Sequence, residues 1–381
     1  MTTTNNNNNK TVFVTGGTGY IGSHCIIDLL NEGYQVITID NLTNSRSGAL
    51  RRVQEITGKA VIFYECDLLD GEAVHGIFAK HKIDYVIHFA AMKAVGESMQ
   101  FPLIYYKNNV IGTINLVEQR TGLITHNTLT VFPQAMKANN VYQMVFSSSC
   151  TVYGDPEHLP ITEDHPTGAV TNVYGRTKYL IEEMLKDLSH KWNIIALRYF
   201  NPVGAHPSGR LGEDPTKNFT NLMPYIGQVA IGKKPNLTIF GCDYDTADGT
   251  GVRDYIHVMD LASGHVSALS KLDEEHLRFK PLNLGLGQGI SVLEFIKEFE
   301  RITKTRIPFE YSGRRVGDVA TLVCDGRRGT AQLGWKPTRS FEILFRCLLT
   351  RPSPRLNWGG RQNTRSRICV SHHSFQLPRC L

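Results

Sequence analysis

A tyrosine and a lysine at helical spacing offer the groups needed for proton transfer. Tyr174 and Lys178 stand four positions apart in a segment whose helical pattern runs on to Leu185, so both side chains lie on one helix face. A free phenol has a pKa of about 10 and is a poor base at neutral pH. A nearby ammonium group would lower that pKa, and the phenolate could then take the proton of an alcohol while a hydride leaves the same carbon. In isolation such a pair is more often part of an ordinary amphipathic helix.

Three glycines near the start of the chain indicate where a dinucleotide would bind. Gly16, Gly19 and Gly22 follow the apolar, β-branched segment 11–15 and precede a helical segment, 23–30. Glycines at this spacing permit a tight turn and a close approach of the backbone to a pyrophosphate. The start of the helix then offers free amide groups and a positive dipole end to the phosphates.

The next predicted strand favours one cofactor over another. Asp40 directly follows the strand predicted at 35–39 and stands 18 residues after Gly22. A carboxylate at this point accepts hydrogen bonds from an adenosine ribose and repels a 2′-phosphate. The unit therefore predicts binding of NAD rather than NADP.

Further apolar segments continue the alternation of strands and helices. Segments 61–64, 85–89 and 144–146 each read as a buried strand, and the last one runs into three consecutive serines, 147–149. Such alternation predicts an α/β protein with a Rossmann-type, doubly wound parallel sheet and ligands at the carboxyl ends of its strands. A serine hydroxyl at that edge could bridge a substrate and Tyr174, although three serines are also ordinary loop sequence. Residues from about 190 onward predict a smaller C-terminal α/β lobe, with a helix-capping box at Ser291–Glu294.

The charge of the chain is unevenly distributed. The 381 residues include 41 lysines and arginines and 35 acids, a formal net charge of +6. Residues 346–381 hold seven arginines and neither lysine nor acid, so the preceding 345 residues carry 34 basic and 35 acidic groups. The excess positive charge is therefore a property of the tail, and the body gives no reason to expect a polyanionic partner.

Other classes of protein are disfavoured by what the sequence lacks. It has no apolar stretch near the ~20 residues that span a bilayer, and its first nine residues do not resemble a signal peptide. The eight cysteines show neither a Cys-x-x-Cys pair nor zinc-ligand spacing, so we expect reduced thiols, no metal and a cytoplasmic location.

Nine ordered blocks of sequence resemble the extended short-chain dehydrogenase/reductase superfamily and, within it, the UDP-glucose (UDP-galactose) 4-epimerase family. The resemblance runs from Lys10 to about Trp335. It is carried by segments 14–22, 40–42, 89–98, 147–154, 174–178, 197–202, 221–225, 249–258 and 314–318.

The resemblance implies a role for each matching residue. Tyr174 would be the general base, Lys178 would lower its pKa and hold the cofactor ribose, and Ser149 would relay the proton. The positions that match cofactor contacts are Gly16, Gly19, Tyr20, Ile21, Gly22, Asp40, Asn41, Asp67, Leu68, Phe89, Ala90, Lys93, Asn108, Ser147 and Lys178. The positions that match contacts to the UDP-sugar are Asn201, Asn221, Leu222, Arg253, Tyr255, Arg315 and Asp318.

The implied reaction is reversible oxidation at carbon 4 of a UDP-hexose, with NAD regenerated in each turnover and the sugar turning over between the two hydride transfers. Nucleotide-sugar dehydratases on the same fold need an Asp-Glu pair where this chain has Cys150 and Thr151. Neither residue provides a carboxylate, which disfavours a dehydratase. Leu322 stands where the family tunes sugar size, and its intermediate bulk leaves turnover of UDP-N-acetylhexosamines open.

Two segments depart from the family. Residues 119–134 interrupt a helix with threonine-rich sequence and a proline, so we expect them to loop out and weaken the homodimer that the resemblance implies. The tail 346–381 suggests either a basic arm for nucleic acid or phospholipid, or, as we prefer, sequence of an alternative exon or shifted frame. A second hypothesis is therefore a catalytically impaired NAD-binding isoform.

The expected organisation follows from these assignments. We predict a disordered lead at 1–9, an NAD-binding domain at 10–190, a UDP-sugar lobe interleaved with it at 191–345, and the atypical tail.

Overall fold

The computed structural model describes residues 9–117, 123–125, 128–130, 135–214 and 221–340. Residues 1–8 of the predicted lead at 1–9, most of the insert and the basic tail at 346–381 lie outside the described residues.

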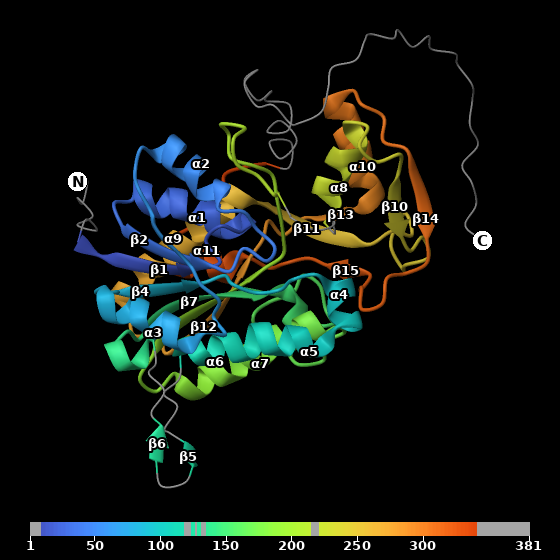
Figure 1. Ribbon diagram of the computed structural model, residues 1–381. Coiled ribbons are helices and arrows are strands. Elements are labelled where there is room, and N and C mark those ends of the chain that lie inside the picture. The colour runs from blue at the N-terminus through green and yellow to red at the C-terminus, as the bar shows by residue number, and fades with distance from the viewer. Residues whose placement is uncertain (1–8, 118–122, 126–127, 131–134, 215–220, 341–381) are drawn as a thin grey trace, which may run out of the picture.

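A seven-stranded parallel sheet forms the centre of the structure (Figure 1). All its pairings are parallel, in the order β12-β8-β7-β4-β1-β2-β3. The order reverses between β1 and β4, which leaves a crevice at the carboxyl ends of these strands. The doubly wound sheet predicted from the sequence is confirmed. Its strands are β1 (Thr11–Thr15), β2 (Gln35–Asp40), β3 (Ile62–Glu65), β4 (Tyr85–His88), β7 (Gln143–Ser149), β8 (Asn193–Tyr199) and β12 (Phe279–Leu284).

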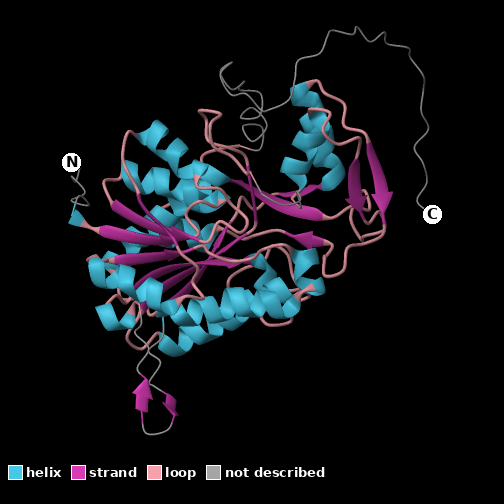
Figure 2. Ribbon diagram, in the orientation of Figure 1, coloured by secondary structure: helices cyan, strands magenta, loops and turns pink. Residues whose placement is uncertain are grey.

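Helices cover both faces of this sheet (Figure 2), which is why β1 and β8 are buried along their whole length. Apolar side chains of one helix layer pack on one face, and those of a second layer pack on the other. The first layer consists of α1 (Tyr20–Asn31), α2 (Gly48–Thr57), α9 (Val258–Glu274) and α11 (Arg327–Leu333). The second consists of α3 (Gly71–Lys80), α6 (Gly112–Val117) and α7 (Val173–Leu188).

The strand that ends in the three serines is longer than predicted. β7 continues through Ser149, so Ser147, Ser148 and Ser149 are its last residues rather than the start of a loop. Their side chains alternate between the two faces of the sheet. A 3₁₀ turn, Cys150–Tyr153, follows directly.

A smaller lobe is built around short strands and two helices. β11 (Val252–His257) pairs with β9 (Asn201–Val203), β13 (Gly289–Ser291) and β15 (Thr321–Leu322). β10 (Leu237–Phe240) pairs with β14 (Phe309–Ser312), and helices α8 (Leu222–Ala230) and α10 (Val292–Thr303) pack in the same layer. The predicted capping box is confirmed, since Ser291 and Glu294 bond reciprocally at the start of α10.

The insert breaks its helix as predicted. α6 ends at Val117, and a hairpin of β5 (Leu123–Thr125) and β6 (Thr128–Thr130) projects from the body (Figure 1). The hairpin was not predicted. The chain then returns through a 3₁₀ turn, Lys137–Asn139, rather than a resumed α-helix.

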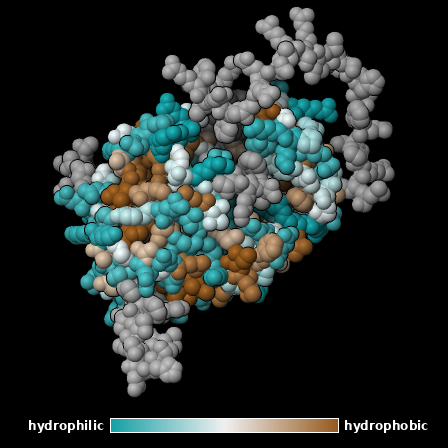
Figure 3. All heavy atoms as spheres, viewed as in Figure 1, coloured by the Kyte–Doolittle hydropathy of each residue, from teal (hydrophilic) through white to brown (hydrophobic). Residues whose placement is uncertain are grey.

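One group of helices carries apolar side chains on its outer surface. Phe101, Leu103 and Ile104 are 52%, 79% and 52% exposed, and Ile111 and Leu180 lie nearby in the same layer. Phe101 lies between α4 (Val95–Gln100) and α5 (Pro102–Tyr105). Leu103 and Ile104 belong to α5, Ile111 to the π-helical turn Tyr106–Ile111, and Leu180 to α7. Figure 3 shows apolar surface over this region.

Two expectations about environment can be compared with the structure. Among the described residues, no helix is long and apolar enough to cross a membrane. Cys25, Cys66, Cys150 and Cys324 are free thiols as expected, whereas Cys242 is disulfide-bonded and departs from that expectation.

Four buried histidines predict acid sensitivity. Burial lowers the pKa of His24, His257 and His265 to about 4 and that of His88 to about 3, from an ordinary 6.5. A lowered pKa means stability that is present above pH 6.5 and lost as pH falls toward those values. We expect each histidine to cost the fold roughly 1 to 2 kcal/mol between pH 6.5 and pH 5.

Urea denaturation at a series of pH values measures this loss. His265→Phe, which cannot take a proton and lies beside Phe89 and Tyr199, should reduce the slope. A free energy of unfolding that stays constant from pH 7 to pH 5 would contradict the assignment.

Candidate active site

The glycine turn between β1 and α1 forms a close backbone cradle. Gly16 has a φ of +73°, and a Cβ there would meet the Ala90 amide nitrogen at 2.8 Å. A Cβ on Gly22 would meet the Gly16 carbonyl oxygen at 2.3 Å. Gly19 caps α1 without a side-chain hydrogen bond, so the first amides of the helix keep their donor capacity. The geometry suits the phosphates of a dinucleotide.

Two other predicted cofactor residues occupy the first turn of α1. Tyr20 donates its hydroxyl hydrogen to the Gly204 carbonyl at 2.6 Å, which ties the turn to the segment after β9. Ile21 packs against the apolar layer beneath the helix. Both therefore support the turn through protein contacts.

The carboxylate of Asp40 organises the loop after β2. It accepts hydrogen bonds from the Thr18 amide at 3.2 Å, the Leu42 amide at 3.0 Å and the Ser45 hydroxyl at 2.9 Å. Asp40 is almost fully buried. It thus connects the glycine turn to the edge where a ribose would lie.

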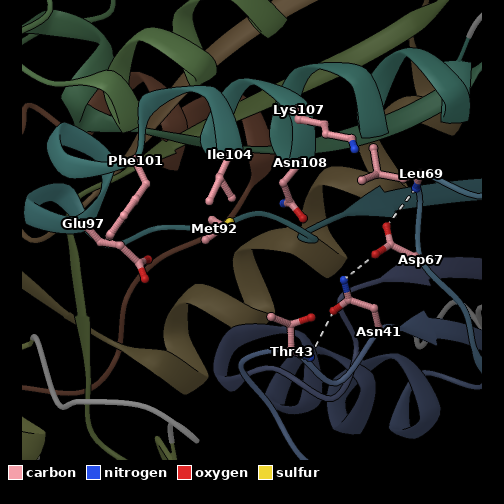
Figure 4. Close-up of a pocket in the computed structure, with 10 residues that line it drawn as sticks. All are labelled: Asn41, Thr43, Asp67, Leu69, Met92, Glu97, Phe101, Ile104, Lys107 and Asn108. Atoms are coloured by element: carbon pink, nitrogen blue, oxygen red, sulfur yellow. Dashed lines mark hydrogen bonds between the residues drawn. The ribbon is translucent and has the colours of Figure 1, made fainter.

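A pocket of about 520 Å³ opens beside this loop (Figure 4). The amide of Asn41 donates to Asp67 at 2.9 Å, which joins the ends of β2 and β3. Asn108 lines the opposite side together with Met92 and Ile104. Leu68 is buried against Gly112, next to the lining residue Leu69. The pocket is apolar on one side and polar on the other, as a nucleotide base and ribose require.

The loop after β4 brings three more predicted residues to the crevice. The Ala90 amide donates to the Thr15 hydroxyl at 3.2 Å, and Phe89 packs against His265 at 4.7 Å between ring centres. Lys93 forms an ion pair with Glu213 at 2.8 Å.

The candidate catalytic residues meet where α7 packs on the end of β7. The buried Lys178 ammonium donates to the Ser147 carbonyl at 2.6 Å and lies 4.8 Å from the centre of the Phe146 ring. Ser147 bonds to the Tyr199 hydroxyl, and Ser149 accepts from Thr151. Tyr174, one turn before Lys178, is fixed by its amide, which donates to the Ser98 hydroxyl at 3.1 Å. The structure therefore brings the three predicted catalytic residues together.

Burial dominates the electrostatics of this group. Burial raises the pKa of Tyr174 to about 12, and the hydrogen bond with Ser149 opposes that rise only in part. Burial lowers the pKa of Lys178 to about 7, against the opposing charge of Glu182. Lys178 is not among the causes of the Tyr174 shift, and its lowering of the Tyr174 pKa beside an oxidised nicotinamide stays a prediction. A further positive charge is needed at this site before the phenolate forms.

The predicted substrate residues converge from the smaller lobe. Arg253 on β11 donates to the carbonyls of Val252, Val319 and Ala320 at 2.8 to 3.2 Å, which fixes its guanidinium. Arg315 lies 4.4 Å from the centre of the Phe240 ring and 4.0 Å from the Asp318 carboxylate.

The remaining positions predicted to bind the substrate lie at the start of a strand, at the start of a helix and in the core of the smaller lobe. Asn201 opens β9, while Asn221 caps α8 and Leu222 begins it. Tyr255 is an exception among the predicted residues, since it is buried against Phe295 at 4.7 Å in the core of the smaller lobe. Its role in substrate binding stays a prediction.

Two acidic residues of this region were missed in the sequence. One oxygen of Glu213 accepts from both Lys93 and Asn221 at 2.8 Å, so it joins the two predicted binding sets. Glu182 lies buried beneath Ser148. The helical spacing of Glu182 after Lys178 was a usable signal, whereas the loop around Glu213 offered none.

Comparison with known proteins gives a consistent assignment. Residues 12–285 match the model of the NAD dependent epimerase/dehydratase family. UDP-glucose 4-epimerase of Drosophila melanogaster is 52% identical over 344 residues, which cover 88% of this chain and 94% of that protein. The enzyme of Homo sapiens is 48% identical over 355 residues, which cover 90% and 97%.

A solved structure agrees with these relatives. UDP-glucose 4-epimerase from Bifidobacterium longum, in complex with NAD⁺ and UDP, superimposes with a TM-score of 0.83 at 46% identity, covering 89% of this chain and 97% of that one. The chain therefore belongs to the NAD dependent epimerase/dehydratase family, among relatives that are UDP-glucose 4-epimerases.

Proposed function

We propose that this protein is an NAD-dependent epimerase that interconverts UDP-galactose and UDP-glucose at carbon 4, through a 4-keto sugar. The observation that carries the proposal is the meeting of Tyr174, Lys178 and Ser149 at the carboxyl end of β7. This end lies in the same sheet edge as the glycine turn after β1. The arrangement combines a proton-transfer group with a dinucleotide cradle.

The residues around the cradle fit NAD. The glycine turn suits its pyrophosphate, Asp40 its adenosine ribose, and Asn41, Asp67 and Asn108 the adjoining pocket. When bound, NAD would supply the hydride acceptor for carbon 4 of the hexose, and its reduced form the donor for the opposite face. Lys93 and Lys178 are the cations placed to hold its polar groups.

Proton transfer falls to Tyr174. Its phenol is protonated in the chain alone, because burial raises its pKa to about 12. The positive ring of an oxidised nicotinamide would favour the phenolate of Tyr174. The ammonium form of Lys178 would act in the same direction. Tyr174 then takes the proton of the 4-hydroxyl group through Ser149 and returns it when the hydroxyl is restored.

Two arginines support the binding of a diphosphate. Arg253 and Arg315 present planar guanidinium groups, which bond two phosphate oxygens at once. The carbonyls around Arg253 and the ring of Phe240 beneath Arg315 hold these groups in fixed orientations. Anchoring by the UDP moiety leaves the 4-keto sugar free to turn over between the two hydride transfers.

The other functions considered are less well supported. Cys150 is buried and burial raises its pKa to about 12, so it cannot replace the carboxylate that a dehydratase requires. The impaired isoform is not supported either, because the match covers 94% and 97% of two UDP-glucose 4-epimerases and each residue proposed for catalysis is present in this chain.

We also propose that two copies associate through the exposed apolar surface at Phe101, Leu103, Ile104, Ile111 and Leu180. The insert 119–134 follows α6 in this layer, so we expect the two copies to associate more weakly than copies of a chain without the insert. We propose that the protein acts in the cytoplasm. Sedimentation of the full chain and of a variant lacking 119–134 tests this. A tight dimer in both would contradict the expected weakening.

Tyr174→Phe tests the proposed chemistry. We expect the full chain to convert UDP-galactose to UDP-glucose, and the variant to lose about 10²- to 10⁴-fold in kcat because the general base is gone. The amount of bound NAD should stay the same, which separates lost chemistry from lost binding. Full activity in Tyr174→Phe would overturn the mechanism, and absence of turnover in the unaltered chain that retains NAD would overturn the proposed function.

Gly22→Ala tests the cradle. Its new Cβ would collide with the Gly16 carbonyl, so we expect at least about a tenfold loss of NAD affinity, measured by calorimetric titration. Gly48→Ala is the matched control, because a Cβ there meets no atom within 4 Å. Equal affinities of the two variants would refute the assignment of the turn.

A further inference from the structure

A buried acid lies one helical turn beyond Lys178 and is not needed for the reaction as described above. The carboxylate of Glu182 is fully buried and forms a forked ion pair with Arg198 on β8, at 2.9 Å to Nε and 2.5 Å to Nη2. An ion pair of this depth is costly to form, since both charges leave water. Simple stabilisation is therefore a weak explanation for its presence.

The same carboxylate reaches the strand that holds the catalytic group. Ser148 donates its hydroxyl hydrogen to Glu182 at 2.5 Å. Ser148 stands directly opposite Arg198 in the β7–β8 register. Its neighbours in the strand are Ser147, whose carbonyl receives the Lys178 ammonium, and Ser149, which bonds to Tyr174. Glu182 thus fixes the centre of the three-serine strand end.

The charges around Lys178 make Glu182 important for a second reason. Lys178 and Arg198 are the cations of this buried region, and Glu182 is the acid that faces both. The other titratable groups nearby are His88 on β4, Tyr199 on β8, Tyr174 on α7, and Cys150 and Tyr153 in the 3₁₀ turn after β7, where the Tyr153 hydroxyl accepts from Arg198 at 3.1 Å. Burial lowers the pKa of His88 to about 3 and raises the pKa of each of the tyrosines and of Cys150, so none of these groups is charged at neutral pH.

We propose that Glu182 is a positioning residue for the reaction: its carboxylate holds the serine strand end in place and keeps Lys178 in the ammonium form. This inference rests on the proposed function for its role in catalysis. Without Glu182, two cations would share an apolar layer. Because arginine does not lose its proton in proteins, the proton would leave Lys178. Tyr174 would then lack the nearby positive charge that favours its phenolate.

The test compares Glu182→Gln with Glu183→Gln, the matched control on the same helix, whose side chain is exposed and pairs with Lys186. In the NAD-bound protein, the ultraviolet absorbance of the phenolate, corrected with Tyr174→Phe, reports the ionisation of Tyr174. We expect Glu182→Gln to raise the apparent pKa of Tyr174 by about one unit and Glu183→Gln to leave it unchanged.

Kinetics provide the second readout. Loss of the Lys178 proton gives the alkaline limb of kcat, so this limb should move to lower pH by about one unit in Glu182→Gln. At a pH on that limb, kcat should fall about tenfold. KM for UDP-galactose should stay within about twofold. Glu182→Asp, which retains the charge, should restore most of the Tyr174 pKa and most of the pH position of the alkaline limb. Glu182→Gln combined with Arg198→Met leaves no unpaired guanidinium and replaces the single variant if that does not fold. Lys178 then still lacks a nearby acid in a layer where burial disfavours its charge, so the pKa of Tyr174 should rise, by less than in the single variant.

The outcomes separate the two proposals. An unchanged Tyr174 titration in Glu182→Gln, or in the double variant, overturns the role of Glu182 whatever the activity. Since the titration needs no turnover, a shifted titration in a chain that does not act on UDP-galactose supports the role of Glu182 and counts against the proposed function alone.

Discussion

The contact between the Lys178 ammonium and the Ser147 carbonyl determines how the candidate site is built. It joins α7 to the end of β7 and buries a cation in the apolar layer between helix and sheet. From that point the 3.6-residue period of the helix places Tyr174 one turn earlier and Glu182 one turn later on the same face. The parallel sheet brings this strand end to the same edge as the glycine turn and Asp40. Proton transfer and dinucleotide binding are thereby placed at one edge.

Burial has a further effect on how the site works. In the chain alone, Tyr174 is neutral and Lys178 is close to losing its proton, because burial disfavours both charged forms. A bound oxidised cofactor would add a positive charge that favours the Tyr174 phenolate. A site of this kind is inactive without its cofactor, and its base is generated where the hydride acceptor is present. The buried anion of Glu182 fits this account as the group that prevents Lys178 from becoming neutral.

Local sequence patterns predicted the parts of the structure that depend on local interactions. The glycine turn, the strand ending at Asp40 and the capping box at Ser291 each follow from steric or hydrogen-bonding needs within a few residues. Long-range contacts were harder to foresee. The bridge from Glu213 to Lys93 joins residues 120 positions apart. The packing of Tyr255 on Phe295 was not foreseen either, because a motif match does not distinguish the two faces of a strand. The pKa of Tyr174 depends on burial, which no spacing reveals.

The central claim is that a hydride is removed from carbon 4 and returned to it while Tyr174 handles only the hydroxyl proton. Turnover of UDP-galactose by the full chain in deuterium oxide, followed by nuclear magnetic resonance of the UDP-glucose formed, measures this directly. Because the hydride never mixes with solvent protons, the account predicts hydrogen and no deuterium at carbon 4. Deuterium at carbon 4 would mean that a proton is removed from the carbon itself, and this result would contradict the account.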